Sequence, residues 1–192
     1  HYSCENGNLE LVKKLMKKGE FDICAIDSDN KTLLHFACQS KNIQLVKYLV
    51  EMNKIDINHK DYKKKTILQY ACESEDFDLI KYLISLDIDI NTKDKSGKSV
   101  LHILCKLGNL DIVKLIFNIP AVNFDVRDNK SRTLLHEACY NEHYELVKFL
   151  VETERVDILA KDKDGCTALH ESSYNHQIIQ YLISLNKFDV ND

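Results

Sequence analysis

Apolar and polar positions recur along this chain with a period of about 34 residues. Each copy opens on Thr or Ser and continues with apolar residues at helical spacing: T-L-L-H-F-A-C (32–38), T-I-L-Q-Y-A-C (66–72), S-V-L-H-I-L-C (99–105), T-L-L-H-E-A-C (133–139) and T-A-L-H-E-S-S (167–173). A second apolar segment follows each of them in the same register, for example L-V-K-Y-L-V at 45–50 and L-I-K-Y-L-I at 79–84. The pattern predicts a series of short helix pairs, each of which buries its apolar face against its neighbours.

The copy that starts at Lys60 illustrates how one repeat is built. Residues 61–65 are polar and predict a hairpin tip, and Thr66 is placed to cap the first helix. Asp76 is placed to cap the second helix. Apolar and acidic residues then alternate with a period of two, which favours a short strand leading into the next hairpin; the matching triplets are D-I-N at 56–58 and 89–91 and D-V-N at 189–191.

The two motifs in phase resemble the ankyrin repeat, whose first helix carries the signature T-P-L-H-x-A. The resemblance implies an α solenoid of stacked helix-turn-helix repeats with β-hairpin-like loops, and it covers the whole chain as a single domain, 1–192. A leading fragment and a shortened last copy make the chain look like a piece of a longer array. The expected repeats are 1–25 (partial), 26–59, 60–92, 93–126, 127–160 and 161–192 (shortened).

Cysteine recurs in one slot of the repeat, at Cys4, Cys38, Cys72, Cys105 and Cys139. Packed helices lie about 8–10 Å apart, whereas a disulfide needs Cα atoms within about 7 Å. We therefore expect these residues to be reduced, small apolar fillers. Reduced thiols favour a cytoplasmic location, with the nucleus as a second possibility.

Histidine and aspartate recur in the same way, at His35, His102, His136 and His170 and at Asp61, Asp94, Asp128 and Asp162. The alternative for the histidines is zinc binding together with the cysteines, but a column supplies only one ligand per repeat, whereas zinc needs ligands around one point. The resemblance implies that these histidines bond within their own turn and to the adjoining loop, and that these aspartates brace the hairpin. We expect no metal and no cofactor.

Composition excludes several classes of function. The chain carries 26 Lys and Arg against 30 Asp and Glu, a net charge of −4, which makes nucleic acid an unlikely partner for the molecule as a whole. The sequence contains no run of 18 apolar residues, so we expect no membrane-spanning segment. The common catalytic and phosphate-binding motifs are missing, so we expect no enzyme activity from these residues.

Charge is concentrated at the five predicted tips, residues 26–31, 60–65, 93–98, 127–132 and 161–166. Together they hold 13 Lys and Arg and 7 Asp, although the whole chain is acidic. Exposed tyrosine among basic residues is typical of interaction surfaces. The predicted contact strip consists of Tyr62, Lys63, Lys65, Lys95, Lys98, Leu107, Lys130, Arg132, Tyr140 and Tyr174. Simple solvation of the tips, with Tyr140 and Tyr174 only covering adjoining repeats, remains the alternative.

These features favour a non-catalytic protein-protein interaction module that binds a partner through the groove of hairpin tips and first helices. A basic strip predicts a partner with an acidic or acidic-aromatic segment. One alternative is recognition of an anionic small molecule or nucleic acid by the basic tips. Another is a regulatory ankyrin segment of a larger enzyme or channel.

Overall fold

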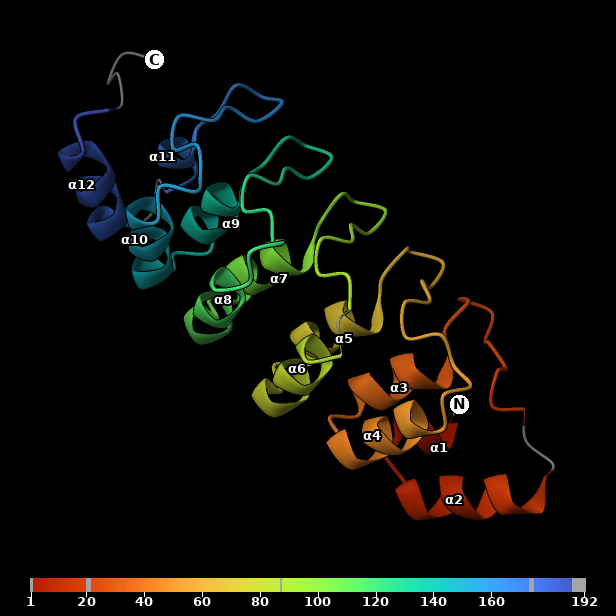
Figure 1. The fold of residues 1–192 in the computed structure, drawn as a ribbon. Helices are drawn as coiled ribbons and strands as arrows, with labels where there is room; N and C mark the ends of the chain where they lie inside the picture. The colour runs from red at the N-terminus through yellow and green to blue at the C-terminus, as the bar shows by residue number, and fades with distance from the viewer. Residues whose placement is uncertain (1, 20–21, 87, 173–174, 188–192) are drawn as a thin grey trace. The chain divides into compact units, whose positions relative to one another are not determined.

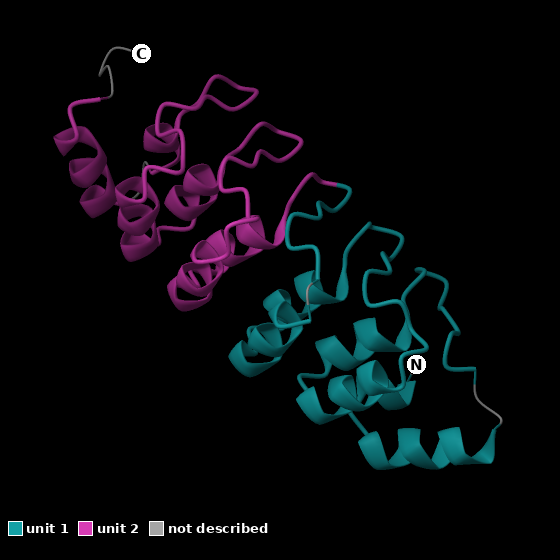
Figure 2. Cartoon of the chain, in the orientation of Figure 1, with its two compact units in different colours: residues 1–95 teal, residues 96–192 magenta. Residues whose placement is uncertain are grey.

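The computed structural model describes residues 2–19, 22–86, 88–172 and 175–187. Within these ranges it contains twelve helices and no β-strand. The chain divides into two compact units, which we call unit 1 (residues 1–95) and unit 2 (residues 96–192) (Figures 1 and 2). Each unit is built from antiparallel helix pairs joined by hairpin loops, so the sequence prediction of a helical solenoid is confirmed.

In unit 1 the helices that open each repeat pack against one another, and each also packs against the helix that follows it. α3 contacts α1, α4 and α5, and its Leu34 is fully buried. The hairpin loops of this unit project from one side of the helix pairs (Figure 1). The helices are α1 (Tyr2–Glu5), α2 (Leu9–Lys18), α3 (Leu33–Gln39), α4 (Ile43–Glu51), α5 (Ile67–Ser74) and α6 (Phe77–Ile84).

Unit 2 repeats this arrangement, with α9 in contact with α7, α10 and α11. Its last repeat has a shorter first helix, which ends before Ser172, in the slot where α9 has Ala138 and α7 has Leu104. Leu169 of that helix is only half-buried, whereas Leu135 in the same slot is fully buried. The helices are α7 (Val100–Leu107), α8 (Leu110–Phe117), α9 (Leu134–Tyr140), α10 (Tyr144–Glu152), α11 (Ala168–Glu171) and α12 (His176–Ser184).

A capping box begins each repeat's first helix from α3 onward. In α3 the Nδ1 atom of His35 accepts a hydrogen bond from the backbone N–H of Thr32 at 3.1 Å. The proton therefore resides on Nε2, which donates to the carbonyl oxygen of Lys65 in the next hairpin at 3.3 Å. His35, His102 and His136 thus each bond within their own turn and to the adjoining loop, as expected.

Replacing His35 with glutamine is expected to remove part of the acid sensitivity of the fold, because the glutamine side chain does not titrate. Glutamine suits this slot, since Gln69 fills it in the next repeat. Burial lowers the pKa of His35 from 6.5 to about 4. The stability contributed by the neutral ring is therefore complete above pH 6.5 and is lost as the pH falls toward 4. Urea unfolding at pH 7 and pH 5 should show that wild type loses about 2 kcal/mol more than H35Q on acidification. Equal losses would contradict this assignment.

The D-I-N triplets form turns, so the strand predicted at 56–58 and 89–91 is wrong. Asp56 Oδ1 accepts a hydrogen bond from the backbone N–H of Asn58 at 2.9 Å, and Asp89 Oδ1 accepts one from Asn91 at 3.0 Å. An aspartate that bonds to the backbone two residues on competes with extended pairing. The D-V-N triplet at 189–191 lies outside the described residues.

Neighbouring tips are joined through their main chains. In each unit, the residue after the tip aspartate donates its backbone N–H to a carbonyl oxygen of the preceding tip, at 2.7–3.0 Å. The fourth residue of every tip, counted from that aspartate, has a left-handed φ between 60° and 80°. The donor–acceptor pairs are Tyr62–Asp29 and Lys95–Lys63 in unit 1, and Asn129–Ser96 and Lys163–Lys130 in unit 2.

The cysteine column has the structural role that its spacing predicts. All seven cysteines lie in the described ranges and none forms a disulfide. Burial raises the pKa of the thiols of Cys38, Cys72 and Cys105, so they remain protonated and unreactive. These residues fill the close approach between helices, as small apolar side chains do.

Candidate interaction surface

The predicted contact residues fall in both units. Tyr62, Lys63, Lys65 and Lys95 belong to unit 1, and Lys98, Leu107, Lys130, Arg132 and Tyr140 belong to unit 2. Tyr174 lies outside the described residues. Each unit therefore presents its own group of candidate side chains.

The most exposed aromatic ring among the unit 1 candidates is Tyr62, whose side chain projects from a hairpin with two-thirds of its surface in solvent (67%). The ammonium group of Lys95 from the next tip lies 3.4 Å from the ring centroid, a close cation–π contact. Lys63 and Lys64 beside it are exposed, and no carboxylate of the described residues pairs with them. We call Tyr62, Lys63, Lys64 and Lys95 the tip surface.

The tip aspartate contributes little negative charge to the tip surface because it is turned inward. Asp61 is only 4% exposed; its Oδ1 accepts from the backbone N–H of Lys65 at 2.7 Å, and its Oδ2 accepts from the Tyr70 hydroxyl at 2.7 Å. Burial, followed by the bond to Asp61, raises the pKa of Tyr70, which keeps the phenol as the donor. Asp61 is therefore a buried residue, and its expected role in bracing the hairpin is confirmed.

The residue that ends each of the first four tips is a cation, and these four residues are here called the tip-final cations: Lys31, Lys65, Lys98 and Arg132. In unit 1 they lie over aromatic rings of the first helices. The ammonium groups of Lys31 and Lys65 lie 5.4 Å and 5.5 Å from the centroid of the buried Tyr70 ring. Their carboxylate partners, Asp29 and Glu73, have side chains 66% and 41% exposed, whereas the lysine side chains are 19% and 20% exposed. Solvent screens the carboxylate side of each pair, which limits what the pair contributes to stability.

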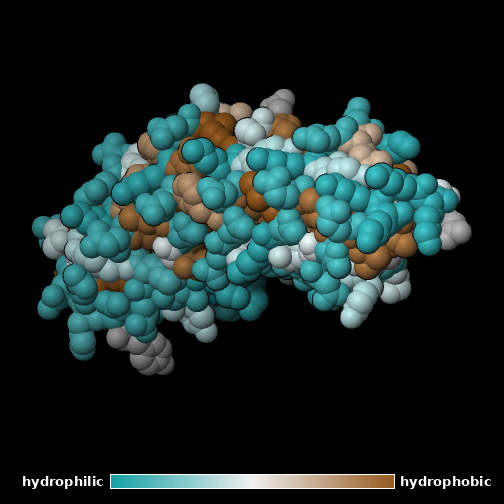
Figure 3. Space-filling model, turned by 90° about the horizontal axis from the view of Figure 1, so that it is seen from below, coloured by the Kyte–Doolittle hydropathy of each residue, from teal (hydrophilic) through white to brown (hydrophobic). Residues whose placement is uncertain are grey.

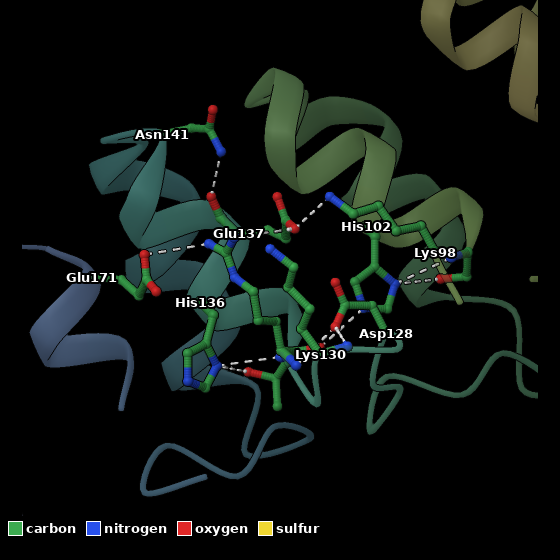
Figure 4. A network of polar contacts seen from close by, with 11 residues as sticks. Lys98, His102, Asp128, Lys130, His136, Glu137, Asn141 and Glu171 are labelled. Atoms are coloured by element: carbon green, nitrogen blue, oxygen red, sulfur yellow. Dashed lines mark hydrogen bonds and ion pairs between the residues drawn. The ribbon is translucent and has the colours of Figure 1, made fainter. Parts of the chain in front are cut away.

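In unit 2 the tip-final cations bind carboxylates of the first helices (Figure 4). Lys98 Nζ lies 2.7 Å from Glu137 Oε1, and the Glu137 side chain is only 2% exposed. The Arg132 guanidinium lies 3.4 Å from Glu171 Oε2 and 4.0 Å from Glu137 Oε1. Lys98 and Arg132 were predicted as partner contacts, yet both are paired with the Glu137 and Glu171 carboxylates of the same unit.

The remaining unit 2 candidates have separate environments. Lys130 is exposed at its tip, and Leu107 is half-buried at the end of α7. Tyr140 at the end of α9 is 61% exposed, with the Arg132 guanidinium 5.0 Å from its ring centroid. Most of the surface of the Tyr140 ring therefore remains in water.

Large apolar side chains on the described surface are scattered. The face seen in Figure 3 is mostly hydrophilic, with apolar residues in separate areas. Of the exposed aromatic residues in the described ranges, Tyr2, Tyr62, Phe77 and Tyr140, two have a cation over the ring: Tyr62 with Lys95 and Tyr140 with Arg132. Surfaces of this composition favour contacts by tyrosine and charge over broad apolar docking.

Two kinds of site were also searched for in the described ranges. No group of three or more His, Cys, Asp or Glu side chains there could hold a metal ion. No helix in those ranges is long and apolar enough to cross a membrane.

Comparison with known proteins identifies the repeat. The family model "Ankyrin repeats (3 copies)" matches residues 1–94, 55–125 and 101–192. No curated protein matches the chain. A solved structure of "Bd0816 Predatory Endopeptidase from Bdellovibrio bacteriovorus in complex with immunity protein Bd3460" contains a chain that is 21% identical, with a TM-score of 0.82 over 95% of both chains.

At this identity the likeness shows the fold alone, and 610 chains of solved structures match, so no single partner can be transferred. Ankyrin repeats generally mediate protein–protein interaction, and the fold is typically non-catalytic. With family matches that span the sequence from its first residue to its last, the chain belongs to the ankyrin repeat family.

Proposed function

We propose that this chain is a non-catalytic protein-binding module that holds an acidic or acidic-aromatic segment of a partner at the tip surface of unit 1. The observation that carries this proposal is the exposed Tyr62 ring among Lys63, Lys64 and Lys95. Tyrosine supplies a large contact area at low entropic cost, and it is enriched among residues that dominate binding energy. The surrounding lysines would steer and orient carboxylates.

Two structural features strengthen the electrostatic part of this proposal. Asp61 is buried and bonded to its own hairpin, so its charge is turned away from solvent. The backbone bonds from Tyr62 to Asp29 and from Lys95 to Lys63 fix the tips relative to each other within unit 1. A segment that binds there would meet hairpins whose main chains are already fixed, so that only the exposed lysine side chains remain to be ordered.

A peptide-display selection on the immobilised chain tests the partner class, followed by fluorescence anisotropy of the selected peptides. We expect selected sequences to be net negative and to contain aromatic residues. Tyr62→Ala and the double variant Lys63→Glu/Lys64→Glu should each weaken binding about tenfold or more. The matched control is Lys17→Glu/Lys18→Glu, which makes the same charge change on exposed positions of α2. Selection without acidic bias, or equal losses in the control, would exclude the tip surface.

The competing candidate is recognition of a free anion or of single-stranded nucleic acid, since an exposed ring among lysines also suits base stacking. Thermal shift with inositol hexakisphosphate and with a short RNA, at two salt concentrations, separates the two. A larger, steeply salt-dependent shift with either ligand than with any selected peptide would replace the proposal.

A further inference from the structure

One slot of the first helix differs in character between the two units. This slot directly follows the His or Gln of the repeat signature and lies beneath the tip-final cations. In unit 1 it holds the rings of Phe36 and Tyr70, whereas in the last two repeats of unit 2 it holds Glu137 and Glu171. In this slot the tip-final cations of unit 1 therefore meet neutral rings, and their carboxylate partners Asp29 and Glu73 come from other positions, whereas those of unit 2 meet the carboxylates themselves.

The two kinds of contact differ in how easily a partner could replace them. Asp29 and Glu73, the partners of the unit 1 cations, have side chains 66% and 41% exposed, so an incoming carboxylate can compete with them in water. Glu137 is buried against Lys98 and Arg132, and its release would leave a buried charge without a partner. Figure 4 shows the Glu137 carboxylate directed toward the Lys98 ammonium group.

We propose that Glu137 and Glu171 are specificity determinants that exclude acidic segments from unit 2. By occupying Lys98 and Arg132 from inside the unit, they weaken the attraction of unit 2 for a partner's carboxylates relative to that of the tip surface of unit 1. This inference rests on the proposed function, because it assumes that the partner is acidic. Glu137 and Glu171 thus decide which of the two units recognises the partner.

The test uses the full chain, with a fluorescent peptide of six aspartates and one tyrosine as the probe. Lys63→Glu/Lys64→Glu, which removes the tip surface, is the background for the comparison. Adding Glu137→Gln/Glu171→Gln to it should raise peptide affinity about fivefold or more, since Lys98 and Arg132 then lack their internal carboxylates. A further Lys98→Gln substitution should remove most of that gain.

The matched control is Glu142→Gln/Glu154→Gln in the same background, because it makes the same change in net charge at exposed positions of unit 2. A gain in the control equal to that of Glu137→Gln/Glu171→Gln would overturn the inference. If Glu137→Gln unfolds the chain by circular dichroism, Glu171→Gln alone decides, since Glu171 is less buried and pairs with Arg132. No gain from a folded Glu171→Gln chain would then overturn it.

Failure of the proposed function has a different signature. In that case wild type would not bind the acidic peptide, or its binding would be unaffected by Lys63→Glu/Lys64→Glu. Failure of the present inference leaves binding by wild type and its dependence on the tip surface intact, and shows only that the Glu to Gln changes have no specific effect.

Discussion

Substituting Gly97 with alanine is expected to lower the free energy of unfolding by about 2–5 kcal/mol, from strain in the left-handed region and from overpacking. Gly97 has a φ of +76°, and a Cβ atom there would lie 2.6 Å from the backbone nitrogen of Asn129. That nitrogen cannot move away freely because its N–H donates to the Ser96 carbonyl oxygen at 3.0 Å. The added methyl group therefore forces the backbone at Gly97 and the backbone at Asn129 apart.

Gly165→Ala is the matched control, since Gly165 has a similar φ of +80° but no atom within 4 Å of the added Cβ. It isolates the backbone term, for which we expect about 1–2 kcal/mol. Urea unfolding of both variants, followed by circular dichroism, gives the comparison. A cost for G97A no greater than that for G165A would show that the hairpins are not held at this distance.

Leu135→Ala should be comparably destabilising, at about 2–5 kcal/mol, because it leaves a cavity at a fully buried position. Leu135 belongs to α9, which packs against α7, α10 and α11. Coupling in a repeat protein runs through nearest neighbours, so the damage should concentrate in unit 2.

Hydrogen exchange measures that distribution. Amides of α9 and α11 should lose protection in L135A while those of α3 in unit 1 keep theirs. The control is Leu159→Ala at an exposed position, which should change stability by about 0.5 kcal/mol or less. Uniform loss of protection along the chain would contradict nearest-neighbour coupling.

The sequence predicts the repeated parts of the fold well because the same slot has the same environment in every repeat. The capping Thr66 and the buried Cys72 follow from slot identity, and the resemblance implies the hydrogen bonds of His35; the structure bears each of them out. The strand at 56–58 failed because three residues with period two do not distinguish an extended segment from a turn closed by the Asp56 side chain.

The candidate surface was predictable in residue identity but not in contacts. Exposure of Tyr62 and Tyr140 could be inferred from slots that vary between repeats. The pairing of Lys98 with Glu137 joins residues 39 positions apart, and the tip residues alone do not reveal it. The available signal was the glutamate in H-E-A and H-E-S, in a slot where the earlier copies carry Phe36, Tyr70 and Ile103.

The backbone bonds between neighbouring tips have a consequence for divergence. Because the Tyr62 and Lys95 contacts to the preceding tips run through N–H and carbonyl groups, the bonds themselves do not depend on which side chains stand there. Such positions can exchange residues over generations at little thermodynamic cost, provided that the left-handed residue beside them is retained. Recognition can therefore drift while the scaffold persists, and the same freedom makes these hairpins suitable for grafting new specificities.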